Sequence, residues 1–213
     1  MSGSESLLAA GAKVTTFLVS GHPRSGTSMM MRALTEGGLE AAHSPELDKL
    51  AANRNGYVQN PTGFFELRPE LQRHPWFPMK HWGQLIKTGF VQLGGLAPGK
   101  YKAIFMLRHP KEIRMSYEAM GEASARQQLG WSRPEEYLPL MKRYVAAASM
   151  RVDMHLLEVW YHDVIENPAA VFERIREFGF PIDAAAAAGA IDRSLYRHRV
   201  EHKEIANEET QGS

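Results

Sequence analysis

The sequence contains no cysteine among its 213 residues. A disulfide framework, a thiolate zinc site and a cysteine nucleophile are therefore excluded. It also lacks any apolar run near the roughly 18 residues that a bilayer-spanning helix needs. Its first residues carry an acidic Glu5 and no basic segment of the kind that opens a signal peptide. From these absences we expect a soluble, cytoplasmic protein without a membrane span.

The sequence also lacks a surplus of positive or negative charge. Lys and Arg number 25 against 24 Asp and Glu, a formal net charge of +1 at pH 7. Because nucleic-acid binders draw affinity from a basic surplus, this balance argues against nucleic acid as a partner, while a small basic pocket for one anionic ligand stays compatible with it. The composition, 44% hydrophobic and 23% charged, is ordinary for a globular protein. We expect one domain over residues 1–213, with frayed tails at 1–12 and 205–213.

Short apolar segments alternate with segments of helical periodicity. The apolar runs predict buried strands at residues 14–20, 84–87, 102–107 and 155–161. Apolar residues at helical spacing predict helices after residue 28 and at residues 111–120, 138–148, 171–178 and 184–188. Residues 40–82 contain five prolines and are expected to be irregular. The alternation predicts an α/β fold of three layers, in which helices flank a largely parallel central sheet.

The strongest local signal is the segment GHPRSGTS at residues 21–28, between the first expected strand and the first expected helix. A glycine-containing turn at this place exposes backbone N–H groups at a helix N-terminus, which suits a phosphate or sulfate. The pattern nearly matches the G-x-x-x-x-G-K-[ST] loop of nucleotide triphosphatases, but Thr27 stands at the position of the lysine. Arg24 is then the nearest replacement cation. The segment predicts an anion-binding loop, with a plain tight turn as the alternative.

The loop PRSGTS resembles the 5′-phosphosulfate loop of sulfotransferases that use 3′-phosphoadenosine 5′-phosphosulfate (PAPS). It is most similar to the PRSGT branch, which includes protein-tyrosine sulfotransferases and many bacterial homologues. A second match is RHPKEIRMS, in which Arg108 ends an expected strand and Ser116 follows eight residues later. A third, weaker match is WYHDVIENP at residues 160–168, with His162 at a usually acidic position. Together the matches span residues 14–181 and imply a P-loop sulfotransferase-like fold.

The resemblance implies a role for each matching residue. Arg24 would neutralise the leaving oxygen of the donor, and Arg108 with Ser116 would bind its 3′-phosphate. The residues implied as donors to the 5′-phosphate, beside Arg24, are Ser25, Gly26, Thr27 and Ser28. Sulfuryl transfer depends on positioning and electrostatic stabilisation, so no metal ion is expected.

The residues on the acceptor side are less determined. A hydroxyl acceptor needs a base. Glu46 lies close to where the tyrosine-sulfotransferase branch has its catalytic glutamate, and Glu66 ends an NPTGFFE segment similar to one in bacterial homologues. Lys87 is a candidate second cation facing the transferred group, with a solvated lysine as the alternative. Arg197 and Arg199 belong to a basic cluster that would either close over the 3′-phosphate or lie on a solvated helix face.

We therefore expect a PAPS-dependent sulfotransferase that transfers a sulfuryl group to a hydroxyl or amine of a small molecule, carbohydrate or peptide and releases adenosine 3′,5′-bisphosphate (PAP). Three histidines are weaker candidates for the base: His43, His74 and His81. Two other functions stay open. One is a P-loop nucleotide kinase or hydrolase, against which the missing loop lysine counts. The other is a non-catalytic sulfotransferase-like nucleotide-binding protein. The sequence does not decide between a monomer and a homodimer.

Overall fold

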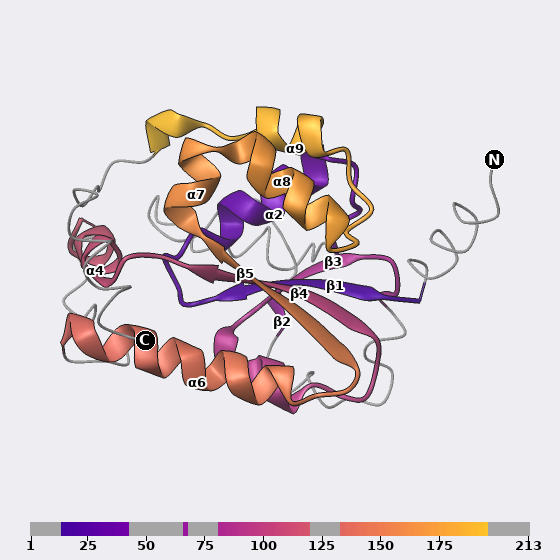
Figure 1. Cartoon of the computed structure of the whole chain (residues 1–213), viewed down its shortest axis with the longest axis horizontal. Helices are drawn as coiled ribbons and strands as arrows, with labels where there is room; N and C mark the ends of the chain where they lie inside the picture. Colours follow the sequence, from indigo (N-terminus) through magenta and orange to yellow (C-terminus); the bar gives the residue numbers. More distant parts are fainter. Residues whose placement is uncertain (1–13, 43–65, 68–80, 120–132, 196–213) are drawn as a thin grey trace, which may run out of the picture.

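A parallel β-sheet forms the middle layer of the fold (Figure 1). The computed structural model describes residues 14–42, 66–67, 81–119 and 133–195, and every structural statement below refers to this part of the chain. Its five strands lie in the order β2-β3-β1-β4-β5, and all neighbouring pairs are parallel. The strands are β1 Thr16–Gly21, β2 Glu66–Leu67, β3 Leu85–Thr88, β4 Tyr101–Leu107 and β5 Met154–Trp160.

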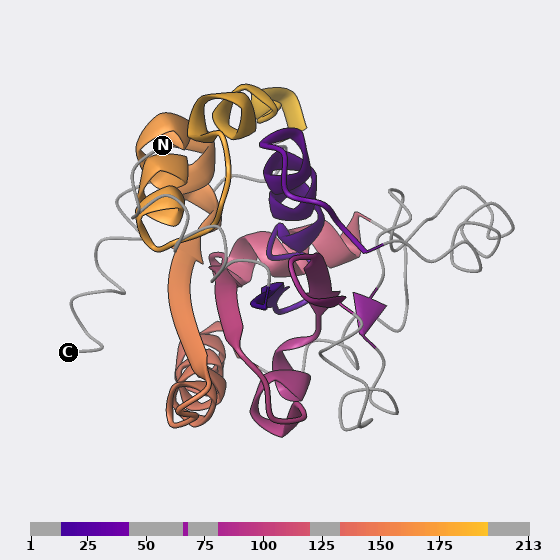
Figure 2. The same ribbon diagram turned by 90° about the vertical axis from the view of Figure 1, so that its right-hand side faces the viewer.

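Helices cover both faces of this sheet (Figure 1, Figure 2). One layer contains α2, α7, α8 and α9, drawn above the sheet in Figure 1, and the other contains α6 with a 3₁₀ helix at Phe90–Gly95. Helix α4 lies near the edge where the strands end, at the left of Figure 1. The helices are α2 Thr27–Glu36, α4 Pro110–Glu118, α6 Tyr137–Ser149, α7 Tyr161–Glu166, α8 Pro168–Glu177 and α9 Ala184–Gly189. None of the helices in the described ranges is long and apolar enough to cross a membrane.

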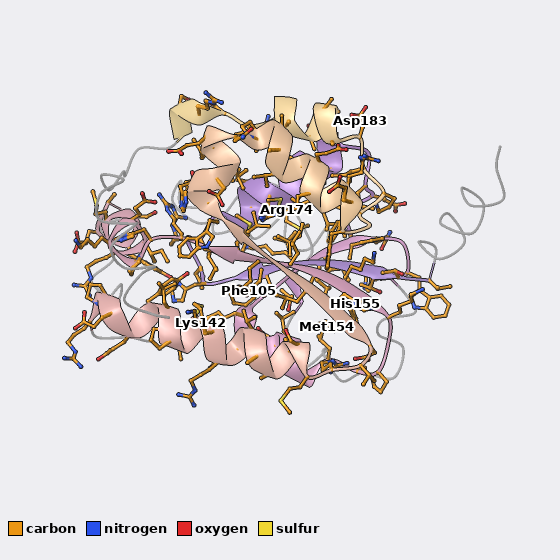
Figure 3. The ribbon with its side chains drawn as sticks, viewed as in Figure 1. Phe105, Lys142, Met154, His155, Arg174 and Asp183 are labelled. Atoms are coloured by element: carbon orange, nitrogen blue, oxygen red, sulfur yellow. The ribbon has the colours of Figure 1, made fainter. Side chains whose placement is uncertain are left out.

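Strand β1 shows how the two helical layers bury the sheet. All of its residues are buried. Phe17 and Val19 pack with residues of α2, α8 and α9, whereas Leu18 packs with the layer that contains α6. Phe105 of β4 also lies on the side of the sheet that faces α6 (Figure 3). Because side chains alternate between two covered faces, the strand is buried throughout instead of alternating between core and solvent.

The three-layer α/β fold predicted from the sequence is confirmed. The four expected strands are β1, β3, β4 and β5, with ends shifted by at most two residues. Two details were wrong. Residues 40–82 include strand β2, which pairs with β3 and is too short to leave a periodic pattern. Residue 161, expected to end a strand, instead begins helix α7, where Tyr161, Val164 and Ile165 are buried at helical spacing.

An ion pair in the turn before β5 forms hydrogen bonds to the turn before β4, at the amino edge of the sheet. Arg151 donates from Nε and Nη2 to the two carboxylate oxygens of Asp153 at 3.0 and 2.8 Å. Its Nη1 donates to the Leu96 carbonyl at 2.7 Å, and the Gly99 N–H donates to Asp153 at 2.9 Å. Burial raises the pKa of Asp153, but these hydrogen bonds and the charge of Arg151 outweigh burial, so the pKa lies below its usual value.

Replacing Asp153 with asparagine is expected to lower the free energy of unfolding at neutral pH by about 1–3 kcal/mol, because Arg151 loses its charged partner. For a chain of this size, that corresponds to a fall in Tm of roughly 2–12 °C. Since the folded pKa is depressed, the carboxylate stabilises the fold above the unfolded pKa of about 3.9, and this contribution is lost as the pH falls through the lower folded value.

Thermal unfolding of the parent and Asp153→Asn chains over a series of pH values measures this effect. The exposed Glu118 at the end of α4 provides a control, because Glu118→Gln removes a carboxylate outside this network. A difference in Tm between parent and Asp153→Asn that stays constant from neutral pH to about pH 3 would contradict the assigned role of the carboxylate.

Candidate active site

The carboxyl ends of β1, β3 and β4 place three predicted features at one edge of the sheet. Gly21 of β1 lies opposite Met106 of β4. The loop 22–26 follows β1, Lys87 lies one residue before the end of β3, and Arg108 follows β4. Strand β1 is the point from which the connections lead to opposite sides of the sheet. In doubly wound α/β sheets, ligands bind outside the carboxyl ends of the strands at this point.

The backbone of the loop turns tightly between β1 and α2. Gly21 has φ 147° and Gly26 has φ 96°, a region that favours glycine. A Cβ on Gly21 would lie 2.6 Å from the Met106 carbonyl oxygen, and one on Gly26 would lie 2.4 Å from the ring of Tyr161. Arg24 has φ 73° and is the only non-glycine residue with positive φ in the described part of the chain. Backbone strain of this kind clusters at ligand sites, where the surrounding structure holds it.

The two motifs predicted to bind phosphate meet at this edge. Arg24 is exposed in the loop, and its Nε donates to Ser116 Oγ on α4 at 3.0 Å. Arg108 Nη1 donates in turn to the carbonyl oxygen of Arg24 at 3.0 Å. These three residues come from two segments far apart in the sequence, yet they form one connected cluster. An anion bound there would meet two guanidinium groups and a hydroxyl.

Arg108 has two further neighbours that the sequence interpretation did not identify. Glu112 Oε2 accepts from Arg108 Nε at 2.9 Å, and both side chains are buried. Arg108 Cζ lies over the Tyr161 ring, 4.3 Å from the ring centroid. Burial raises the pKa of the Tyr161 hydroxyl, although the charge of Arg108 acts in the opposite direction. Glu112 lies four residues after Arg108, in the first turn of α4, and this spacing could have revealed the first contact, whereas the second depends on tertiary packing.

An aromatic layer supports the first half of the loop. The His22 ring is buried and stacks on Phe90, with the ring centroids 5.5 Å apart. It meets the rings of Tyr117 on α4 and Tyr137 on α6 edge-on. The Tyr137 hydroxyl also lies 3.4 Å from the backbone nitrogen of Arg108, which donates to it. The layer therefore connects the loop to the start of α4, and no periodic signal in the sequence predicted it.

A buried serine hydroxyl in the loop bears on whether the site suits an anion. Ser25 is fully buried, and its Oγ has no hydrogen-bond partner within the described residues. Its N–H donates to the His22 carbonyl at 3.0 Å. An unpaired buried hydroxyl costs free energy, so it indicates a site for an acceptor such as a phosphate oxygen. Thr27 and Ser28 lie in the first turn of α2, where helix N–H groups and the helix dipole also favour an anion.

The remaining predicted residues are placed only in part. Lys87 is buried on β3, opposite Glu66 of β2 in the register of the sheet. The pairing brings the backbone of Glu66 to the same edge as the loop. Three other predicted residues lie outside the described residues: Glu46, Arg197 and Arg199.

The structure argues against one of the candidate bases. His81 precedes β3, its Nδ1 lies 3.1 Å from Gln84 Oε1, and its carbonyl accepts from the side chain of Thr16 at the start of β1. It therefore lies at the amino edge of the sheet, opposite the loop. His43 and His74 fall outside the described residues. In the described ranges, no group of three or more His, Asp or Glu side chains is arranged to hold a metal ion.

Comparison with known proteins supports the fold. No protein-family model matches the sequence, and no curated protein is similar to it in sequence. The sulfotransferase domain of the olefin synthase from Synechococcus PCC 7002 superposes with a TM-score of 0.52 at 14% identity, over 93% of this chain and 94% of that one. At this level of identity the likeness concerns the fold: the chain has the three-layer α/β fold of sulfotransferase domains.

Two other solved structures have lower scores. The sulfotransferase domain from the curacin biosynthetic pathway has a TM-score of 0.46 and 13% identity, over 93% of this chain and 97% of that one. Sulfotransferase STF1 from Mycobacterium tuberculosis H37Rv has a TM-score of 0.47 and 15% identity, over 96% of this chain and 79% of that one.

Proposed function

We propose that this protein is a PAPS-dependent sulfotransferase of the branch with a PRSGT loop, which transfers a sulfuryl group to a hydroxyl or amine acceptor and releases PAP. The observation that carries the proposal is the connected cluster of Arg24, Ser116 and Arg108. It links the loop after β1 with the segment from Arg108 to Ser116, the two places where the sequence predicts a 5′-phosphate and a 3′-phosphate. A ligand with two phosphate groups suits this arrangement better than one with a single polyphosphate chain.

Each residue of the cluster has a chemical role in this proposal. PAPS supplies the sulfuryl group and leaves as PAP. The loop N–H groups and the hydroxyls of Ser25, Thr27 and Ser28 bind the 5′-phosphate, because they lie at the N-terminus of α2. Arg24 is exposed beside them and stabilises negative charge that develops on the leaving oxygen. Arg108 and Ser116 bind the 3′-phosphate through a charged fork and a hydroxyl.

The acceptor side of the proposal rests on fewer observations. Lys87 is buried at the carboxyl end of β3, where a cation near the transferred group would act in a low dielectric. Glu66, aligned with Lys87, and Glu46 remain the two candidates for the base that removes the acceptor proton. Arg197 and Arg199 are proposed to close over the 3′-phosphate. No metal ion has a part in this chemistry.

PAP is expected to raise the Tm of the protein far more than AMP or ATP, and without Mg²⁺. A ligand at a hundred times its Kd stabilises the fold by about 2.7 kcal/mol, which corresponds to roughly 5–11 °C for a chain of this size. AMP lacks the 3′-phosphate and ATP carries its extra phosphates elsewhere, so neither can use both parts of the site. Thermal shift with the three nucleotides at equal concentration measures the difference.

Arg108→Ala is the matched variant for this experiment. It removes a charge-assisted contact of about 1.5–3 kcal/mol, so the affinity for PAP should fall roughly tenfold to a hundredfold while the affinity for AMP barely changes. Arg143, exposed on α6 in the opposite layer, gives a control for loss of positive charge. Equal shifts with PAP and ATP, or a strict need for Mg²⁺, would instead support a nucleotide kinase or hydrolase.

A further inference from the structure

A buried carboxylate beside Arg108 has no part in the chemistry described above. The Glu112 side chain is 1% exposed, and its Oε2 lies 2.9 Å from Arg108 Nε. It lies in the first turn of α4, on the same helix as Ser116. A buried charge is costly unless it is paired, and a buried pair often contributes little net stability. The position of this pair, next to the site for the 3′-phosphate, therefore matters more than its contribution to the stability of the fold.

Three contacts hold the guanidinium group of Arg108 from different directions. Glu112 accepts from Nε, and the Arg24 carbonyl accepts from Nη1 at 3.0 Å. Arg108 Cζ also lies over the Tyr161 ring, 4.3 Å from the ring centroid. Hydrogen bonds at two nitrogens restrict rotation of the group, and the ring supports the group from another side. Because the five N–H donors form a rigid planar fork, these contacts set the direction of all five.

We propose that Glu112 is a positioning residue that orients Arg108 toward the 3′-phosphate and thereby sets the preference for PAP over AMP. This inference rests on the proposed function. This positioning role requires a side chain at position 112 that is long enough to place an oxygen within hydrogen-bond distance of Arg108 Nε. The alternative is a structural role, in which a negative charge in the first turn stabilises α4 through the helix dipole. That role depends on charge and is less sensitive to reach.

Three substitutions of Glu112 separate reach from charge. Glu112→Gln keeps an oxygen at the same reach but removes the charge. Glu112→Asp keeps the charge but withdraws the oxygen by one methylene, and Glu112→Leu removes the acceptor altogether. The measurement is the ratio of the Kd for AMP to the Kd for PAP, obtained by titration calorimetry on the full chain. Thermal unfolding of each variant confirms that it is folded at the temperature of the titration.

The expected result is a ratio within about threefold of the parent for Glu112→Gln and a loss of roughly tenfold for Glu112→Asp and Glu112→Leu, on the scale of one charged hydrogen bond. In an Arg108→Ala background, Glu112→Asp should no longer change the ratio, because the residue that it positions is gone. Any other order among the three variants, including equal ratios or loss in Glu112→Gln alone, overturns the positioning role.

The same titration distinguishes this inference from the proposed function. If the parent chain prefers PAP and the ratio is insensitive to Glu112, only the positioning role fails. A parent chain without a preference for PAP refutes the proposed function, and the positioning role falls with it. Should Glu112→Leu fail to fold, the contrast between Glu112→Gln and Glu112→Asp still decides the question.

Discussion

Arg24→Ala is expected to lower the rate of sulfuryl transfer by about a hundredfold or more, the scale observed when one preorganised electrostatic donor is removed. In the proposed reaction the charge on the leaving oxygen grows as the bond to sulfur breaks, so an interaction with Arg24 would belong mainly to the transition state. The affinity for PAP should fall less, because the loop N–H groups and the pair Arg108 and Ser116 remain. In this variant we therefore expect a large loss in the rate of sulfuryl transfer and a smaller loss in the affinity for PAP.

Single-turnover transfer from PAPS, run beside PAP titrations, measures both quantities once a screen has supplied an acceptor. Arg24→Lys should recover part of the rate, since it restores the charge but not the planar fork that now donates to Ser116. Arg32, exposed on α2 beyond the loop, provides a control, and Arg32→Ala should transfer at close to the parent rate. An Arg24→Ala chain that matches the parent rate would remove the leaving-group role from this residue.

Much of the fold followed from the sequence because its strands are buried on both faces. The run at residues 102–107 has no alternation of polar and apolar residues, and the structure places it inside the sheet as β4, between β1 and β5. Helix α2 was predictable for a similar reason, since Met30, Ala33 and Leu34 form one buried face. Strand β2 was not predictable, because two residues give no period, and its existence depends on pairing with β3.

The residues of the candidate site also divide into those that the sequence indicated and those that it did not. The loop at residues 21–28 and the pair Arg108 and Ser116 carry local patterns, so the sequence indicated them before their contact was known. Among the partners that hold them in place, Glu112 carries such a pattern through its spacing of four residues from Arg108, whereas Tyr161 and the aromatic layer around His22 carry none. Tyr161 reaches both Gly26 and Arg108 only because α7 begins where β5 ends, beside the loop after β1. Such contacts arise from the order of strands in the sheet, which a single sequence does not reveal.

Gly26→Ala is expected to reduce the affinity for PAP by at least about a hundredfold, and a second glycine makes the reason testable. Gly26 has φ 96° and Gly38, beyond the end of α2, has φ 94°. Alanine at either position incurs the same kind of strain, on the order of 1–2 kcal/mol. At Gly38 a Cβ meets nothing within 4 Å among the described residues, whereas at Gly26 it would lie 2.4 Å from the Tyr161 ring.

The two substitutions therefore share the cost of backbone strain and differ in what the new methyl group displaces. At Gly26 either the loop or the ring must move, and that ring supports the guanidinium of Arg108, so both proposed phosphate sites should be disturbed together. Thermal unfolding should show a fall in Tm of roughly 2–8 °C for Gly38→Ala and a larger one for Gly26→Ala. Titration should show PAP binding close to that of the parent for Gly38→Ala alone. If Gly26→Ala binds PAP as well as Gly38→Ala does, the loop between β1 and α2 does not hold the 5′-phosphate.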